Sequence, residues 1–208
     1  MSEALHNVPE TSGTPRDSGG AADISALEII VAVPQDQHGD MLARELSRTR
    51  SSVRRIWPLP ERLPATADVM FCELMPELPQ CLPWVPGKPS AALVAVINAI
   101  GAPQLKLLRN CAPHATLPRP FTGATVVTSL AVGRAQFLYE QRLRARIDKL
   151  DETLRSFRSV ERAKGILMDK RQLDEEQAYH FIRRQAMSQR VSVAAVAAAI
   201  IDSNDILG

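Results

Sequence analysis

Five short apolar runs, separated by polar stretches, mark the first part of the chain. They are LEIIVAV (27–33), SVRRIW (52–57), DVMFCEL (68–74), AALVAVIN (91–98) and HATLPRPF (114–121). The first, third and fourth runs are hydrophobic at almost every position, which is typical of parallel strands buried on both faces. The pattern therefore predicts five parallel strands.

Helix-like segments lie between several of these runs. The stretch HGDMLARELSRTR has a helical pattern after the first run, and another helical pattern begins at Thr122. Residues 75–90 contain five prolines, so we expect a loop or one short turn there. Residues 1–24 are rich in Gly, Ser, Thr, Pro and Asp and predict a disordered leader. The alternation predicts a doubly wound α/β domain with a five-stranded parallel sheet.

A different periodicity begins after the α/β pattern. Apolar residues with spacings of 4, 3, 4 and 3 form a heptad seam on one helix: Leu143, Ile147, Leu150, Leu154 and Phe157. The same stripe would serve an amphipathic helix packed on its own domain. In a parallel pair, Arg146 would face Asp151 of the other chain, an attractive match that favours a coiled-coil dimer.

Residues 158–204 predict three short helices. Asp174 and Gln177 have the spacing of a capping box at the start of the second, and Ser192 can cap the third. Each helix is too short to be stable alone, so the three must pack together.

Charge and cysteine content narrow the class of protein. The chain of 208 residues is 45% hydrophobic with a net charge of +2, but residues 134–190 hold 14 Lys or Arg against 9 Asp or Glu. An anionic partner is therefore expected in the C-terminal part. Cys72, Cys81 and Cys111 form no CxxC pattern, which fits reduced thiols in the cytoplasm, and no metal or cofactor is predicted. There is no apolar run of about 18 residues and no signal-peptide pattern.

An aromatic residue and an arginine lie side by side on the second of the three helices. Tyr179 and Arg183 are four residues apart, and an unpaired base can stack on such a surface while a phosphate is held nearby. Further basic residues could extend this face: Lys164, Lys170, Arg171, Arg184 and Arg190. The alternative is a half-buried Tyr179 beside a solvated basic face. A helix-turn-helix is disfavoured, because the last helix offers mostly alanine outside.

Four sequence runs carry a resemblance to a known family. AKGILM (163–168), EEQAY (175–179), IRRQAM (182–187) and VAAAII (196–201) closely resemble the ANTAR family, the RNA-binding output domains of transcription antiterminators. Upstream, VRRIWPLPE (53–61), the α/β domain and the coiled coil are similar to the AmiR-like antiterminators. The resemblance implies a dimer that binds hairpins in a nascent leader mRNA and prevents a terminator from forming.

The resemblance also implies a domain layout. Residues 25–133 would be a receiver-like (flavodoxin-like) domain, 134–157 a coiled-coil linker helix, and 158–204 the three-helix ANTAR domain. Lys164 and Gly165 would lie where the family meets RNA, which would explain a glycine inside a helical pattern.

The receiver-like part departs from the residues that phosphotransfer needs. Glu73, Asn98 and Arg119 stand where a receiver has its phosphate-accepting Asp, its Ser or Thr and its Lys, so they form a degenerate phosphoacceptor pocket. Glu73 could mimic a phosphorylated Asp or reflect loss of the chemistry. The resemblance implies control through sequestration by a ligand-sensing partner with a periplasmic-binding-protein fold, AmiC-like, in place of phosphorylation.

Parts of the sequence also fit two other classes of function. An enzyme could use Cys72 as nucleophile, His114 as base and Glu73 as orienting group, but Cys72 falls inside an apolar strand, where an inert thiol is more common. The prediction is therefore not an enzyme. The alternative to an antiterminator is a dimeric adaptor or signalling protein that binds no nucleic acid.

Overall fold

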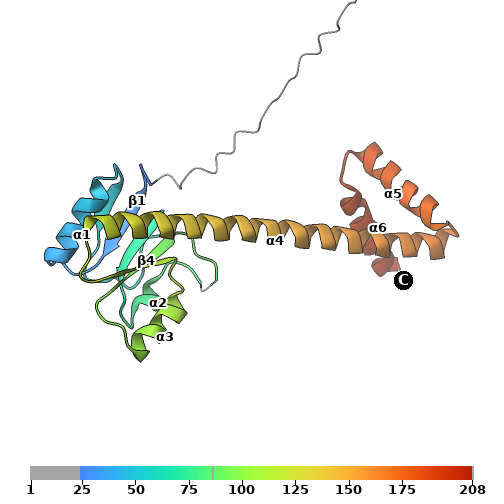
Figure 1. The fold of residues 1–208 in the computed structure, drawn as a ribbon. Coiled ribbons are helices and arrows are strands. Elements are labelled where there is room, and N and C mark those ends of the chain that lie inside the picture. The colour runs from blue at the N-terminus through green and yellow to red at the C-terminus, as the bar shows by residue number, and fades with distance from the viewer. Residues whose placement is uncertain (1–23, 86, 208) are drawn as a thin grey trace, which may run out of the picture. The chain divides into compact units, whose positions relative to one another are not determined.

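The computed structural model describes residues 24–85 and 87–207 (Figure 1). The predicted leader lies outside this part of the chain except for Ile24. The chain divides between Tyr139 and Glu140 into two compact units. The first holds the sheet and the second is helical. The functional limits of each domain stay a prediction.

Five parallel strands form one sheet in the order β2-β1-β3-β4-β5. They are β1 (Glu28–Ala32), β2 (Ser52–Arg55), β3 (Val69–Glu73), β4 (Ala92–Ile97) and β5 (Ala115–Pro118). Every residue of β3 and β4 is buried, as continuous hydrophobicity predicts for strands covered on both faces. The strand order is that of flavodoxin-like folds, and the predicted α/β class is confirmed.

Helices cover both faces of this sheet (Figure 1). They are α1 (Gln37–Ser47), α2 (Leu78–Cys81), α3 (Ala102–Cys111) and the first part of α4 (Gly123–Arg171). Leu42 of α1 and Leu130 of α4 pack into one core, whereas Leu78 of α2 and Cys111 of α3 pack into the core on the other face. The proline-rich segment supplies only the short helix α2, as predicted.

Helix α4 approaches the sheet closely at one glycine. A Cβ atom on Gly133 would lie 3.0 Å from Val94 Cγ2 and 3.4 Å from Ala115 Cβ. These contacts are tight, so the absence of a side chain at Gly133 allows α4 to pack directly on β4 and β5.

The second unit consists of the rest of α4 followed by α5 (Glu175–Gln189) and α6 (Val193–Leu207). Ala163 and Leu167 of α4 pack against α5 and α6 in one core. The first of the three predicted helices is therefore the last part of α4, not a separate short helix. Residues 134–158 contain no glycine or proline that could end the helix, which explains why α4 continues.

We expect Gly133→Val to destabilise the sheet-containing unit by about 1–3 kcal/mol, because a branched side chain would overpack the contact with Val94. Both tryptophans, Trp57 and Trp84, belong to this unit, so fluorescence in a urea titration reports its unfolding. Gly165→Ala, in the same helix, is the matched control, since no atom lies within 4 Å of its added Cβ. An unchanged midpoint for Gly133→Val would contradict the packing argument.

Candidate nucleic-acid interface

Side-chain caps fix the starts of the two C-terminal helices. The Asp174 carboxylate accepts a hydrogen bond from the Gln177 backbone N–H at 2.7 Å, and Gln177 Oε1 accepts one from the Asp174 N–H at 3.2 Å. This is the predicted capping box. Ser192 Oγ likewise accepts from the Ala195 N–H at 3.1 Å. These caps fix where α5 and α6 begin, and the apolar core holds both helices beside α4.

Lys164 links α4 to the start of α5. Its Nζ donates to Glu161 Oε1 at 2.9 Å and to Glu175 Oε1 at 2.7 Å. The hydrogen bond with Glu175, followed by the one with Glu161, raises the pKa of Lys164, and the bond to Lys164 lowers the pKa of Glu175. Only 8% of Lys164 is exposed. The expectation that Lys164 shares an exposed face with Tyr179 and Arg183 is therefore wrong, because two carboxylates close over its ammonium group.

Gly165 and Tyr179 are both open to solvent. Apart from its own helix backbone and chain neighbours, no atom of the described residues lies within 4 Å of a Cβ built on Gly165, so packing among residues 24–85 and 87–207 does not require a glycine there. Tyr179 is 42% exposed, with its ring centroid 6.3 Å from that of His180. Tyr179 thus lies outside the core formed by α4, α5 and α6, with part of its surface accessible and the rest covered, which agrees with the alternative of a half-buried residue.

The predicted basic residues do not form one continuous face. Arg183 and Arg184 line a shallow hollow on α5, together with His180 and Met187. Two further basic residues lie at the end of α4, Lys170 and Arg171, and line a different pocket. Arg190 terminates α5 with a left-handed backbone, φ 56°.

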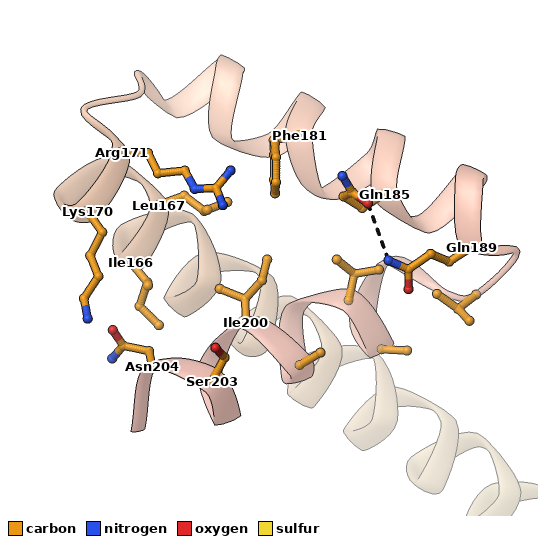
Figure 2. A pocket seen from close by; sticks show the side chains of 14 residues that line it. Ile166, Leu167, Lys170, Arg171, Phe181, Gln185, Gln189, Ile200, Ser203 and Asn204 are labelled. Atoms are coloured by element: carbon orange, nitrogen blue, oxygen red, sulfur yellow. Dashed lines mark hydrogen bonds between the residues drawn. The ribbon is translucent and has the colours of Figure 1, made fainter. Parts of the chain in front are cut away.

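The pocket beside Lys170 and Arg171 was not predicted from the sequence. It has a volume of about 490 Å³ and lies between the end of α4, one flank of α5 and α6 (Figure 2). Phe181, Gln185 and Gln189, which face it from α5, recur every four residues. That spacing is a readable sign of a shared helix flank, but the hollow depends on small residues of α6 opposite.

The heptad seam of α4 is exposed along its whole length within this chain. Its five members are between 43% and 62% exposed: Leu143, Ile147, Leu150, Leu154 and Phe157. Large apolar side chains in an uncovered stripe usually mark an interaction surface.

The degenerate phosphoacceptor residues meet at the carboxyl end of the sheet. Arg119 Nη2 contacts Glu73 Oε2 at 2.9 Å, and Arg119 Nη1 contacts Asp36 Oδ2 at 3.0 Å. The Asn98 amide donates a hydrogen bond to the other oxygen of Glu73. Bonding to the Gly39 N–H and the charge of Arg119 both lower the pKa of Asp36. One guanidinium group therefore bridges the two carboxylates of this site and offsets part of their negative charge.

Comparisons with known families match both units. The model described as "AmiR, N-terminal" matches residues 27–134, and the ANTAR domain model matches residues 148–201. The chain belongs to the AmiR N-terminal family. It is an AmiR-like regulator that also carries a C-terminal ANTAR domain.

Individual relatives agree with this family. The aliphatic amidase regulator of Pseudomonas aeruginosa is 26% identical over 82% of this chain and 89% of its own length. The transcriptional regulatory protein PdtaR of Mycobacterium tuberculosis is 27% identical over 54% of this chain and 55% of its own length. Both relatives are regulatory proteins by name, and PdtaR is a transcriptional one.

Solved structures of response regulators resemble this chain at lower sequence identity. The response regulator StyR is 10% identical, covers 84% of this chain and 98% of its own, and gives a TM-score of 0.48. A CheY-like response regulator from Mesorhizobium loti is 16% identical, covers 51% of this chain and 98% of its own, and gives 0.38. At these TM-scores neither likeness bears on function.

The residues of the candidate enzyme are engaged in structural roles. Burial raises the pKa of the Cys72 thiol, and no part of Cys72 is exposed. His114 Nδ1 accepts a hydrogen bond from the Leu93 N–H at 2.9 Å, and Glu73 is held by Arg119. A nucleophile needs an accessible thiolate, so this AmiR-like chain gives no support to cysteine catalysis.

None of the helices in residues 24–85 and 87–207 has the length and apolar character needed to cross a membrane.

We expect acetyl phosphate with Mg²⁺ to leave the chain unmodified, because Glu73 offers no aspartyl acceptor and Arg119 already pairs with it. Intact-mass spectrometry before and after incubation tests this. A phosphorylatable receiver protein incubated in parallel is the control for the reagent. An acid-labile phosphate on the sheet-containing unit would contradict the prediction.

Proposed function

We propose that this chain is an antiterminator that binds hairpins in a nascent leader mRNA as a dimer and prevents a terminator from forming. The observation that carries the proposal is an exposed Tyr179 four residues from an exposed Arg183, within the region matched by the ANTAR domain. An aromatic ring stacks unpaired bases and a guanidinium group holds phosphate. Such a role would put the protein in the cytoplasm, as the sequence predicts.

The bare backbone at Gly165 supports this site. A glycine in a helix interior costs roughly 0.5–1 kcal/mol relative to alanine, and nothing in the packing of the chain requires it. A partner that approaches the helix backbone closely would require it. Lys164 contributes less than the family resemblance implies, because Glu161 and Glu175 already neutralise its charge. We therefore propose Arg183 and Arg184 as the principal phosphate contacts.

Dimerisation follows from the exposed seam. The stripe from Leu143 to Phe157 has the spacing of coiled-coil core positions, and burying it against a second copy would remove large apolar side chains from water. Two copies would present two ANTAR domains to two hairpins.

Control would come from a partner and not from phosphorylation. Arg119 pairs with Glu73, and the family resemblance places both at the positions where receivers carry out phosphotransfer. An ion pair there would leave no acceptor for the usual switch. By relationship to the aliphatic amidase regulator, we propose a ligand-sensing partner with a periplasmic-binding-protein fold, AmiC-like, that sequesters the antiterminator.

Replacing Leu150 and Leu154 together by Lys should give monomers, because the dimer would bury two charges per chain in a desolvated seam. Light scattering measures the mass. The matched control carries lysines at the outward heptad positions, Ala145→Lys with Glu152→Lys, and should remain dimeric. An unchanged mass for the seam variant would rule out this seam as the interface.

Tyr179→Ala and Arg183→Ala should both weaken RNA binding while leaving the fold intact, since both side chains are exposed. If Tyr179 stacks a base, its loss costs on the order of 1–3 kcal/mol with little change in salt dependence. If Arg183 contacts a phosphate, its loss flattens the log–log salt dependence by roughly 0.7–0.9. Titrations of the chain's own leader RNA at several salt concentrations separate the two. Folded, dimeric variants that bind leader RNA as tightly as the parent would show that Tyr179 and Arg183 do not form the RNA-binding site.

A further inference from the structure

The pocket at the end of α4 combines apolar and basic residues, unlike the face of α5 that is proposed to contact phosphate. Its lining includes the apolar residues Leu167, Val196 and Ile200. The basic residues Lys170 and Arg171 also line it (Figure 2). None of the residues that line it is acidic. A volume of about 490 Å³ is within the range of about 300–1,000 Å³ for small-ligand sites. The pocket therefore suits a compact, partly apolar group attached to an anionic chain.

One wall of the pocket is a stacked cation and aromatic ring. The guanidinium carbon of Arg171 lies 4.7 Å from the centroid of the Phe181 ring, and Figure 2 shows both side chains directed into the hollow. Unpaired bases in RNA loops stack on aromatic rings and on guanidinium planes. This wall thus offers a stacking surface that Tyr179, elsewhere on α5, cannot provide to the same base.

The adjacent wall carries two primary amides. Gln189 Nε2 lies 3.4 Å from Gln185 Oε1, and in the part of the chain that the structure describes these amides have no other side-chain partner. A side-chain amide has both donors and an acceptor, and can therefore pair with the edge of a base. A hydrocarbon ligand would leave these groups unsatisfied, which disfavours a purely apolar occupant.

The arrangement of α5 connects this pocket to the proposed interface. Phe181, Gln185 and Gln189 occupy one flank of the helix, and Tyr179 and Arg183 occupy the other. Arg184 is exposed on the outward side between the two flanks. An RNA backbone that contacts Arg183 and Arg184 would cross α5 and bring a neighbouring loop nucleotide to the pocket.

We propose that this pocket holds one unpaired loop base of the bound hairpin, stacked on the Arg171–Phe181 pair and identified by Gln185 and Gln189. This inference rests on the proposed function and adds a second contact point, which confers selectivity for one base. Arg183 and Tyr179 would supply affinity that is common to many loops, whereas the two glutamines would distinguish the bases.

A pool of RNA hairpins with a constant stem and a randomised loop tests the inference. The parent protein is expected to retain hairpins with a preferred base at one or more loop positions. Gln185→Ala with Gln189→Ala, which removes the amides without introducing a poor helix former, should lose the preference at one position. Its affinity for the parent's best hairpin should fall roughly 5–150-fold. Arg183→Ala is the contrasting variant and should weaken all loops while preserving the preference.

A second measurement tests whether the selected base lies in the pocket. With 2-aminopurine at the selected loop position, binding to the parent should change its fluorescence, and this change should be lost in Arg171→Gln at RNA concentrations that saturate the variant. Circular dichroism melting verifies that each variant is folded.

The outcomes separate this inference from the proposed function. RNA binding with an unchanged base preference in the folded glutamine variant would overturn the pocket assignment and leave the antiterminator proposal standing. The pocket variants could instead change the binding of a peptide or the self-association of the chain while RNA selection is unaffected. That result would also overturn the pocket assignment and leave the antiterminator proposal standing. If the parent retains no hairpin from the pool, the proposed function and the pocket assignment both fail.

Discussion

The rest of this structure depends on the apolar stripe of α4. This one helix places different parts of the stripe against different packing partners. Leu130 packs against the sheet, Ala163 and Leu167 pack against α5 and α6, and the apolar side chains from Leu143 to Phe157 are exposed among residues 24–85 and 87–207. The two outer segments are covered when each unit folds. In the proposed dimer, a second copy would cover the middle segment.

In the sheet-containing unit, Arg119 forms ion pairs with two carboxylates. In a receiver, clustered carboxylates require a metal ion and a phosphoryl group to change the local charge. Here Asp36 and Glu73 are instead bridged by a side chain of the protein itself, at 3.0 and 2.9 Å. In the proposed regulation, this unit therefore acts as a docking surface for a partner, and information enters through protein binding.

The sequence pattern predicted the features that depend on residues close together in the chain. It failed for features that depend on contacts between side chains far apart in the sequence. The sheet, the Asp174 capping box and the heptad seam were all readable, because each is a local pattern. The burial of Lys164 was not, since its partner Glu175 lies 11 residues away, across the turn between α4 and α5. The pocket beside Phe181 was missed for a similar reason: its volume depends on how small residues of α6 face α5, which no single helical pattern contains.

The division of labour proposed for α5 connects dimerisation to regulation. The proposed contacts of Arg183 and Arg184 with phosphate would be electrostatic and common to all RNA, so a single ANTAR unit would bind many hairpins with modest affinity. Joining two units through α4 makes the second hairpin contact intramolecular, which raises the overall affinity without any new interaction. A partner that separates the two copies, or that holds one unit away from RNA, would remove this gain for paired hairpins and leave only weak single contacts. Sequestration could thus silence the protein without covering the RNA-binding residues themselves.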